Sequence, residues 1–201
     1  MKFLNQANLF QLIAYDPGGT IGFFHAIVDL HAFSRPENKI LNNLIYWNCG
    51  ELSGSEIDQE GQLTAFIKQY HFVNGRRIRT QVIGEAFDLV QLIGGDDILS
   101  PVRINAVVEW ECAKLGVPWA LQRRHLRTKV TKERLKLWGF TERFRKDEFA
   151  ATQHGWYYLR SLKQQSLFRP WKLESDSATN ARWDCSCAEG RNRKCNLIHP
   201  K

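Results

Sequence analysis

The chain has 201 residues, of which 43% are hydrophobic, and it carries a formal net charge of +7. This apolar content, with seven Trp residues, excludes a disordered chain and favours one main globular domain. No apolar run approaches the roughly 18–20 residues that cross a bilayer, and the N-terminal residues lack the apolar segment and cleavage site of a secretion signal. We therefore expect an intracellular protein with no membrane partner.

The predicted elements begin with an apolar run at 8–16 that ends in Asp16, and Pro-Gly-Gly at 17–19 turns the chain into a second run. Ser100-Pro101 is a typical helix start and Gly116 a typical helix end. The predicted elements in full are strands at 8–16, 20–32, 40–49, 80–87 and 117–122, and helices at 58–72, 101–115, 131–138 and 147–162. A strand meander followed by alternating helices and strands predicts an α/β fold, with a mixed five-stranded sheet flanked by helices.

The positive charge is concentrated in one part of the chain. Residues 123–146 hold ten Lys or Arg and only two Glu, whereas the residues before 123 are net acidic. A basic segment beside an acidic half is typical of nucleic-acid enzymes, in which the cations bind phosphates and the acids bind metal ions. A solvated basic surface without a ligand is the alternative.

Three acidic residues lie at the ends of predicted elements. Asp16 and Glu85 each end an apolar strand, and Asp147 lies at the start of the last helix. If the two strands are neighbours, the carboxylates of Asp16 and Glu85 meet at one end of the sheet, where a cation must offset their repulsion. Carboxylates and water are the ligands of Mg²⁺ or Mn²⁺, and two such ions support phosphodiester hydrolysis. Each acid has a plainer interpretation: Asp16 as a turn residue, Glu85 as a chance acid at a strand end, and Asp147 as a helix cap.

Four stretches in this order resemble the ribonuclease H-like fold and, within it, the RuvC-type Holliday-junction resolvases, especially phage-borne members. They are AYDPGGTIGFF at 14–24, VIGEAF at 82–87, LSPVRINAVVEWECAKLGVPWALQ at 99–122 and DEFAATQHGWYYL at 147–159. The resemblance covers residues 9–160. It implies a homodimeric endonuclease, located in the cytoplasm of a bacterium or of a phage-infected host, that nicks opposed strands of a four-way DNA junction and leaves ligatable ends.

By the same resemblance, Asp16, Glu85 and an acid of the last helix hold two Mg²⁺ (or Mn²⁺) ions. The chain departs from the family pattern in that helix, because Ala150 stands where a metal-binding acid is expected. Three explanations remain open: an engineered Asp-to-Ala change, a natural enzyme in which Asp147 or Glu148 does the work, and a natural inactive DNA-binding protein. Alternatively, Ala150 is an ordinary small residue between helix and sheet.

Other residues near these motifs are assigned roles with the DNA. His154 lies on the helix face of Asp147 and Ala150, where it could orient a water or a phosphate, and an ordinary hydrogen-bonded helix residue is the alternative. Lys129 is a candidate to neutralise the scissile phosphate. Phe87 could stack at the junction centre, although a core position is the commoner role of such a residue. The predicted phosphate contacts are Arg123, Arg124, Arg127, Lys132 and Arg134.

The helix at 101–115 is a candidate dimer face, since Ile104, Val107, Val108 and Trp110 give it more apolar surface than one sheet face needs, and burial in the chain's own core is the alternative. We place the nuclease domain at 1–165 and a small basic tail at 166–201. Three sulfurs and an imidazole in that tail could form a tetrahedral structural Zn²⁺ site, and free thiols in a flexible tail are the alternative. These four residues are Cys185, Cys187, Cys195 and His199.

The main hypothesis is thus an Mg²⁺-dependent, structure-selective endonuclease. Two alternatives are a catalytically silent protein that binds branched DNA, and another ribonuclease H-like nuclease that acts on RNA–DNA hybrids or branched DNA. An actin-like ATPase also begins with a carboxylate followed by glycines, but 201 residues leave no room for its second nucleotide-binding half.

Overall fold

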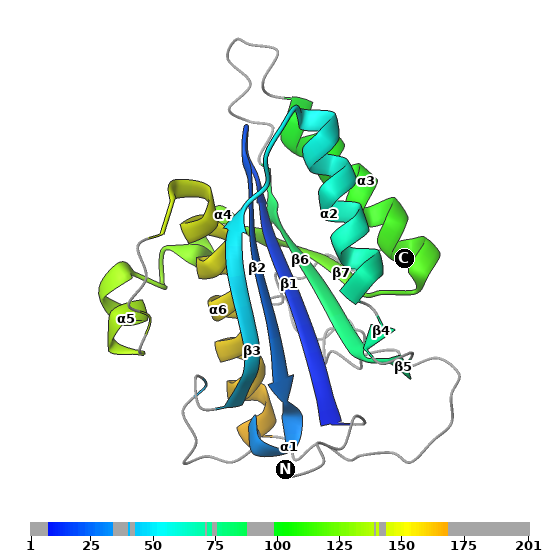
Figure 1. Ribbon diagram of the computed structural model, residues 1–201. Helices are drawn as coiled ribbons and strands as arrows, with labels where there is room; N and C mark the ends of the chain where they lie inside the picture. Colours follow the sequence, from blue (N-terminus) through cyan, green and yellow to red (C-terminus); the bar gives the residue numbers. More distant parts are fainter. Residues whose placement is uncertain are drawn as a thin grey trace, which may run out of the picture.

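The computed structural model describes residues 8–33, 40, 43–70, 72–73, 76–87, 99–138, 140 and 144–168. Its strands are β1 (Leu9–Pro17), β2 (Ile21–Asp29), β3 (Leu44–Glu51), β4 (Phe72–Val73), β5 (Arg76–Arg77), β6 (Arg79–Ala86) and β7 (Trp119–Arg123). Five of them form one mixed sheet with the order β3-β2-β1-β6-β7, and β4 pairs with β5 in a separate two-stranded sheet (Figure 1).

The pairing of the central strands brings the two strand-end acids together. β1 is antiparallel to β2 and parallel to β6, and Tyr15 lies opposite Gly84 in the parallel pair. The next residues along these strands are Asp16 and Glu85, so their backbones lie side by side at the same end of the sheet. The antiparallel pairing of β2 with β3 and the parallel pairing of β6 with β7 complete the sheet.

Helices cover both faces of this sheet (Figure 1). Helices α2 and α3 pack on one face, and α6 packs on the other face across β1 and β2, with α4 and α5 beside it. Alternate residues of β1 therefore enter different cores: Phe10 and Leu12 pack towards Trp156 of α6, and Ile13 packs towards Leu63 and its neighbours on α2 and α3. The helices are α1 (Leu30–Phe33), α2 (Glu56–Tyr70), α3 (Leu99–Leu115), α4 (Arg124–Arg127), α5 (Lys132–Leu137) and α6 (Lys146–Phe168).

The predicted fold class is confirmed, while several element boundaries differ. The strand expected at 20–32 ends at Asp29, because its carboxylate accepts hydrogen bonds from the backbone N–H groups of His31 and Ala32 and starts helix α1. Helix α2 begins earlier than expected, since Ser55 and Asp58 form a reciprocal cap in front of it. The strands β4 and β5 and the helix α4 were not predicted.

Helix α6 continues to Phe168, past the expected end at 162 and past the domain boundary placed at 165. The boundary remains a prediction, as does the zinc site, whose four residues lie outside the described part of the chain. Over the described ranges, no helix combines the length and the apolar character needed to span a membrane.

The core contains a histidine that should make the fold sensitive to acid. His25 is fully buried against the rings of Tyr46 and Phe66, and burial lowers its pKa from 6.5 to about 4. Between these values the unfolded chain binds a proton at this histidine and the folded chain does not, so the free energy of unfolding falls as the pH falls. We expect a loss of about 2–3 kcal/mol between pH 7.5 and 4.5 from this residue.

Urea denaturation at several pH values measures this effect. The change His25→Phe keeps an aromatic ring between Tyr46 and Phe66 and removes the titrating group. Because the other titrating groups are common to both chains, the difference between their pH profiles isolates His25. Identical profiles would contradict the prediction.

Candidate metal centre and nucleic-acid interface

Two carboxylates and one guanidinium form the centre of the site. The side chains of Asp16 and Glu85 are each 13% exposed at the end of the sheet, and Nη1 of Arg127 donates to both of them. The distances from Nη1 are 2.9 Å to Oδ2 of Asp16 and 2.6 Å to Oε2 of Glu85. Burial and the nearby charge of Glu85 raise the pKa of Asp16, and the positive charge of Arg127 opposes this rise.

The position of Arg127 follows from the short helix α4, which begins directly after β7. Leu126 is buried and anchors this helix, and α4 packs against α6. Arg127 is thereby turned towards the acids with its side chain 15% exposed. Its neighbour Arg124 is exposed, with Nε 3.9 Å from Oε1 of Glu85. The two arginines were both predicted as phosphate contacts, and the structure places one of them among the carboxylates.

His154 of α6 completes the contacts around Glu85. Its side chain is fully buried, and Nε2 lies 2.8 Å from Oε2 of Glu85, where a protonated Nε2 donates to the carboxylate oxygen. Its Nδ1 lies 3.0 Å from Oε1 of Gln122 on β7. The ring is therefore held between two neighbouring strands, and it fixes the orientation of the Glu85 carboxylate.

Asp147 lies at the start of α6, over the turn between β1 and β2. Its backbone N–H donates to Oε1 of Glu51, and its Oδ1 lies 3.7 Å from the place that a Cβ on Gly18 would occupy. Glu148 caps the helix by accepting from the backbone N–H of Arg145. Burial raises the pKa of Asp147, an effect that Lys146 opposes and Glu51 reinforces.

Ala150 is buried at 5% exposure, one helical turn before His154. The two residues share the α6 face that also carries Asp147. The sequence places the missing carboxylate at position 150, and the structure shows that His154, one turn later, is the α6 residue that contacts Glu85. The role of position 150 remains a prediction.

The remaining predicted DNA contacts lie at the ends of β6 and β7 or on the segments that follow them, and we call the basic ones the basic rim, namely Arg123, Lys129, Lys132 and Arg134. Lys129 is exposed, and its Nζ lies 5.7 Å from the centroid of the Tyr157 ring. Lys132 is also exposed, and its Nζ lies 5.2 Å from the centroid of the Phe149 ring. Arg134 is exposed and donates to the backbone oxygen of Lys129. Phe87 is half-buried just after β6. Arg123, the last residue of β7, is also exposed.

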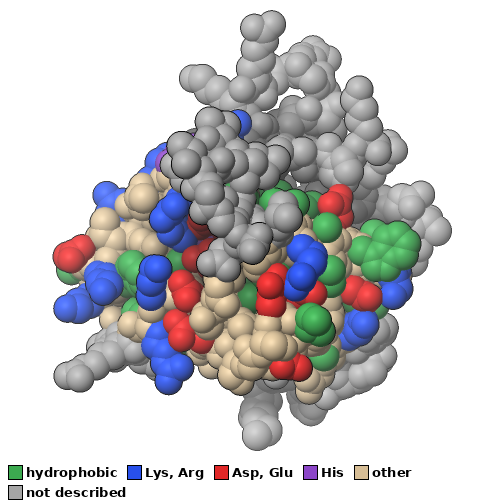
Figure 2. Space-filling view, turned by 90° about the horizontal axis from the view of Figure 1, so that it is seen from above, with side chains coloured by type: hydrophobic (Ala, Val, Ile, Leu, Met, Phe, Trp, Pro, Cys, Tyr) green, Lys and Arg blue, Asp and Glu red, His purple; other side chains and the backbone are tan. Residues whose placement is uncertain are grey.

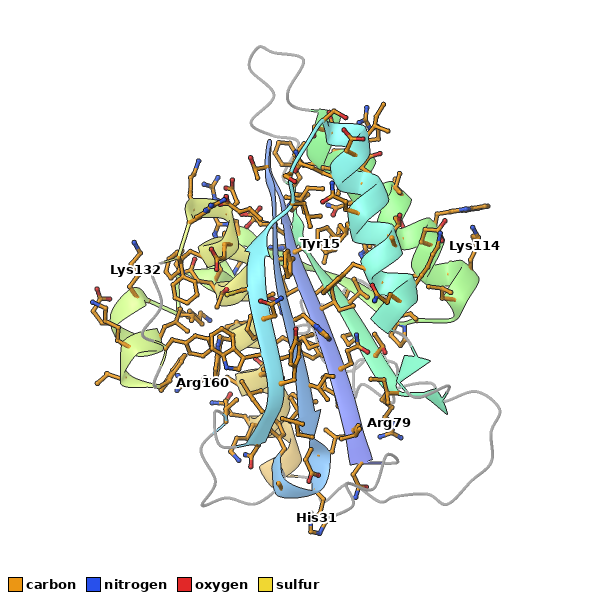
Figure 3. All side chains as sticks on the ribbon, in the orientation of Figure 1. Tyr15, His31, Arg79, Lys114, Lys132 and Arg160 are labelled. Atoms are coloured by element: carbon orange, nitrogen blue, oxygen red, sulfur yellow. The ribbon has the colours of Figure 1, made fainter. Side chains whose placement is uncertain are left out.

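Basic and acidic side chains both lie on the surface at this end of the sheet. Seen from the end of the sheet that carries the acids, Lys and Arg side chains lie among Asp and Glu side chains, and they are most numerous towards the side of α4 and α5 (Figure 2). Lys132 projects from α5 at the periphery, whereas Tyr15 lies in the middle of the sheet (Figure 3).

A buried polar network behind the acids was not predicted. The Tyr15 hydroxyl donates to Oδ1 of Asn105 over 2.7 Å and accepts from Nε1 of Trp119 over 3.1 Å. Nδ2 of Asn105 donates to the backbone oxygen of Glu85 over 3.0 Å. This network ties β1, β7 and α3 to the backbone of Glu85. The available signal was a polar residue on the buried face of a predicted helix, because such residues are usually hydrogen-bonded.

The donor atoms are suited to a hard divalent cation. Oxygens of Asp16 and Glu85 converge on one positively charged atom, Nη1 of Arg127, which stands in for a cation between them. Mg²⁺ is commonly bound through one or two carboxylates, with waters and substrate phosphates as the other ligands. Among the described residues, no group of three or more His, Cys, Asp or Glu side chains is arranged to hold a metal ion. The carboxylates that converge are those of Asp16 and Glu85, and Asp147 does not join them in such a group.

No family model and no curated protein matches the chain. Among solved structures, the chain is similar to that of Thermus thermophilus RuvC, with a TM-score of 0.51 and 14% identity over 77% of this chain and 96% of that chain. A complex of T. thermophilus RuvC with a Holliday junction substrate gives a TM-score of 0.47 and 16% identity, over 76% of this chain and 96% of that chain. The likeness to the first structure, with the sheet topology, shows a ribonuclease H-like fold. These matches give no support to the narrower resemblance to phage-borne members.

Proposed function

We propose that this chain is an Mg²⁺- or Mn²⁺-dependent endonuclease that cuts branched DNA, with the four-way junction as its substrate. The observation that carries the proposal is the pair of carboxylates, Asp16 and Glu85, that meets at the carboxyl ends of two parallel strands and converges on one cation. Catalysis of phosphodiester hydrolysis needs negative ligands of this kind beside a positively charged DNA-binding surface.

In this mechanism Asp16 and Glu85 would hold the ion, and Asp147 is the candidate for contact with a second ion. A bound ion would supply a Lewis acid for the phosphate oxygen and would activate a water. His154 holds the Glu85 carboxylate in place. The exposed basic residues of β7, α4 and α5 bind DNA phosphates and thereby set the position of the strand, and the shape of the branched DNA provides the selectivity.

The proposal includes a homodimer, which would place two such sites on one junction. Of the apolar residues that suggested α3 as the dimer face, Ile104 and Val108 are buried in the core of their own chain, so they are not available to a partner. Trp110 is 67% exposed and Val102 39% exposed on the outer side of the same helix. We place the dimer contact on these two residues.

A second candidate function is a catalytically silent protein that binds branched DNA. Two observations favour it: Arg127 already neutralises the acid pair, and the buried position 150 carries no carboxylate. A silent protein would keep the basic rim and its affinity for the junction, and that affinity would fall with salt.

Cleavage of a labelled four-way junction by the chain with Ala150, called the wild type below, and by Ala150→Asp separates these candidates. The substitution adds a carboxylate on the α6 face that carries Asp147 and His154. We expect the variant to make paired, ligatable nicks in Mg²⁺ or Mn²⁺ at least about a hundredfold faster than the wild type, as a completed ligand set would allow.

Binding to the same junction, measured without metal, serves as the control and should be equal for both chains. If neither chain cuts and both bind, the silent protein is the correct interpretation. Equal cutting by both chains would show that position 150 is not a ligand position. An RNA–DNA hybrid tested in parallel identifies the other ribonuclease H-like activity.

A further inference from the structure

The guanidinium of Arg127 occupies the place between the two carboxylates where a metal ion would bind. One nitrogen atom, Nη1, contacts both Oδ2 of Asp16 and Oε2 of Glu85. A positive charge therefore already compensates the two acids, which explains how they can lie together at 13% exposure. An ion that needs the same two oxygens cannot bind while the guanidinium holds them.

We propose that Arg127 is an internal, displaceable cation, and that a divalent metal ion binds this site by exchange with the Arg127 guanidinium. The inference rests on the proposed metal use of the site and concerns how the free protein and the metal-bound protein interconvert. It makes the affinity for metal in the absence of DNA weaker than the carboxylate pair alone would give.

The Arg127 guanidinium lies close to solvent. The side chain is 15% exposed, so the exchange requires only a change of its rotamer and no unfolding of a helix. Its helix α4 stays anchored by the buried Leu126 during such a change. Exposed basic side chains lie around it on the same segment, namely Arg124 and Lys129, which favours a DNA phosphate next to the displaced guanidinium.

Charge accounts for the direction of the exchange. A divalent ion brings twice the charge of the guanidinium to the same two carboxylates, and a nearby phosphate offers the displaced arginine a bidentate partner. Arg127 would then fill the acid pair in the free protein and contact the substrate in the complex. His154 keeps its hydrogen bond to Glu85 in both states, because it approaches that carboxylate from α6.

Titration of Mn²⁺ into the DNA-free protein, followed by calorimetry, tests this exchange. We expect Arg127→Gln to bind Mn²⁺ at least about tenfold more tightly than the wild type, because the competing cation is gone. Asp16→Asn should bind no Mn²⁺ at this site. The matched control is Arg124→Gln, which removes a charge 3.9 Å from Glu85 but no hydrogen bond to Asp16, and its affinity should stay within about threefold of the wild type.

An unchanged or weaker affinity in Arg127→Gln would overturn the proposal, since it would make Arg127 a support of the metal site. An equal gain in Mn²⁺ affinity in Arg124→Gln would also overturn it, because the loss of any nearby positive charge would then explain the effect. If Arg127→Gln leaves the acids too close for folding, Arg127→Lys replaces it. Its side chain is one bond shorter, so its ammonium is set back from the two oxygens that Nη1 contacts, and we expect tighter Mn²⁺ binding than in the wild type. No gain in that variant would contradict the exchange.

This titration contains no DNA, so it is independent of the junction cleavage that tests the proposed function. If Mn²⁺ displaces Arg127 but the chain cuts no DNA, the exchange is supported and the nuclease function is contradicted. If the chain cuts DNA but Arg127→Gln leaves the Mn²⁺ affinity unchanged, the nuclease function is supported and the exchange is contradicted.

Discussion

Replacing Asp16 by Asn, or Glu85 by Gln, is expected to reduce cleavage of a four-way junction by at least about a thousandfold, the scale on which single charge-stabilising groups act in hydrolytic sites. Each change keeps the size of the side chain and removes the negative charge that holds the ion. Both acids contact the same nitrogen of Arg127, so the loss of either one leaves a single carboxylate for a divalent ion. The measurement is the single-turnover rate of strand cleavage in Mg²⁺ and in Mn²⁺.

The control for these variants is Glu56→Gln, which changes an acid of α2 that pairs with Arg103. Its cleavage rate should equal that of the wild type. Junction binding without metal should survive in all three variants, because phosphate contacts on the basic rim carry the affinity. Cleavage that persists in both Asp16→Asn and Glu85→Gln would remove the acid pair from the reaction.

Replacing Gly22 by Ala is expected to have the largest effect on the fold. A Cβ at Gly22 would lie 2.0 Å from the backbone oxygen of Asp147 and 2.6 Å from the backbone nitrogen of Glu148. Backbone atoms cannot rotate away, so the first turn of α6 must move off β2. We expect the free energy of unfolding to fall by about 3 kcal/mol or more, at the upper end of overpacking costs.

Chemical denaturation measures this loss, and Gly19→Ala in the neighbouring turn is the matched control. A Cβ at Gly19 would meet no atom within 4 Å, so this variant should be as stable as the wild type. Because α6 also carries His154, a displaced helix should reduce junction cleavage as well as stability. Equal stability of the Gly22→Ala and Gly19→Ala variants would contradict the observed packing of α6 on β2.

The fold could be predicted because its signals are local. Apolar runs, the Pro-Gly-Gly turn and the helix stop at Gly116 each act over a few residues, and their order restricts the sheet to few topologies. The positions of Asp16 and Glu85 also followed from such signals, since both acids directly end apolar strands. What made them neighbours was the parallel pairing of β1 with β6, which the order of elements favoured.

The partners of these acids could not be predicted in the same way. Arg127 lies in a basic run, and nothing local distinguishes it from Arg124, which points to solvent. The four-residue helix α4 that turns it inward is too short to produce a periodic pattern. The contact of His154 with Glu85 likewise depends on the position of α6 along the sheet. Long-range packing sets this position, for example at Gly155, where a Cβ would meet the ring of Phe24.

Asn105 is another residue whose role could not be predicted from the sequence. Its uncharged side chain lies on the buried side of α3. A polar residue in that position indicates a hydrogen bond but does not identify the partner. It is nevertheless the residue that joins Tyr15 to the backbone oxygen of Glu85. Hydrogen-bonded polar residues of this type depend on three elements at once, so they become visible only when those elements are placed together.

The coverage of the central strands by α6 has a consequence for the order of events during synthesis. The helix that packs across β1 and β2 is the last element of the described chain to leave the ribosome, and it brings His154 with it. Until then one face of the sheet has no cover, and its apolar residues, among them Phe10 and Phe24, remain exposed. A nascent chain that stops before α6 should therefore need protection by chaperones, and the site is complete only when nearly the whole described chain has been translated.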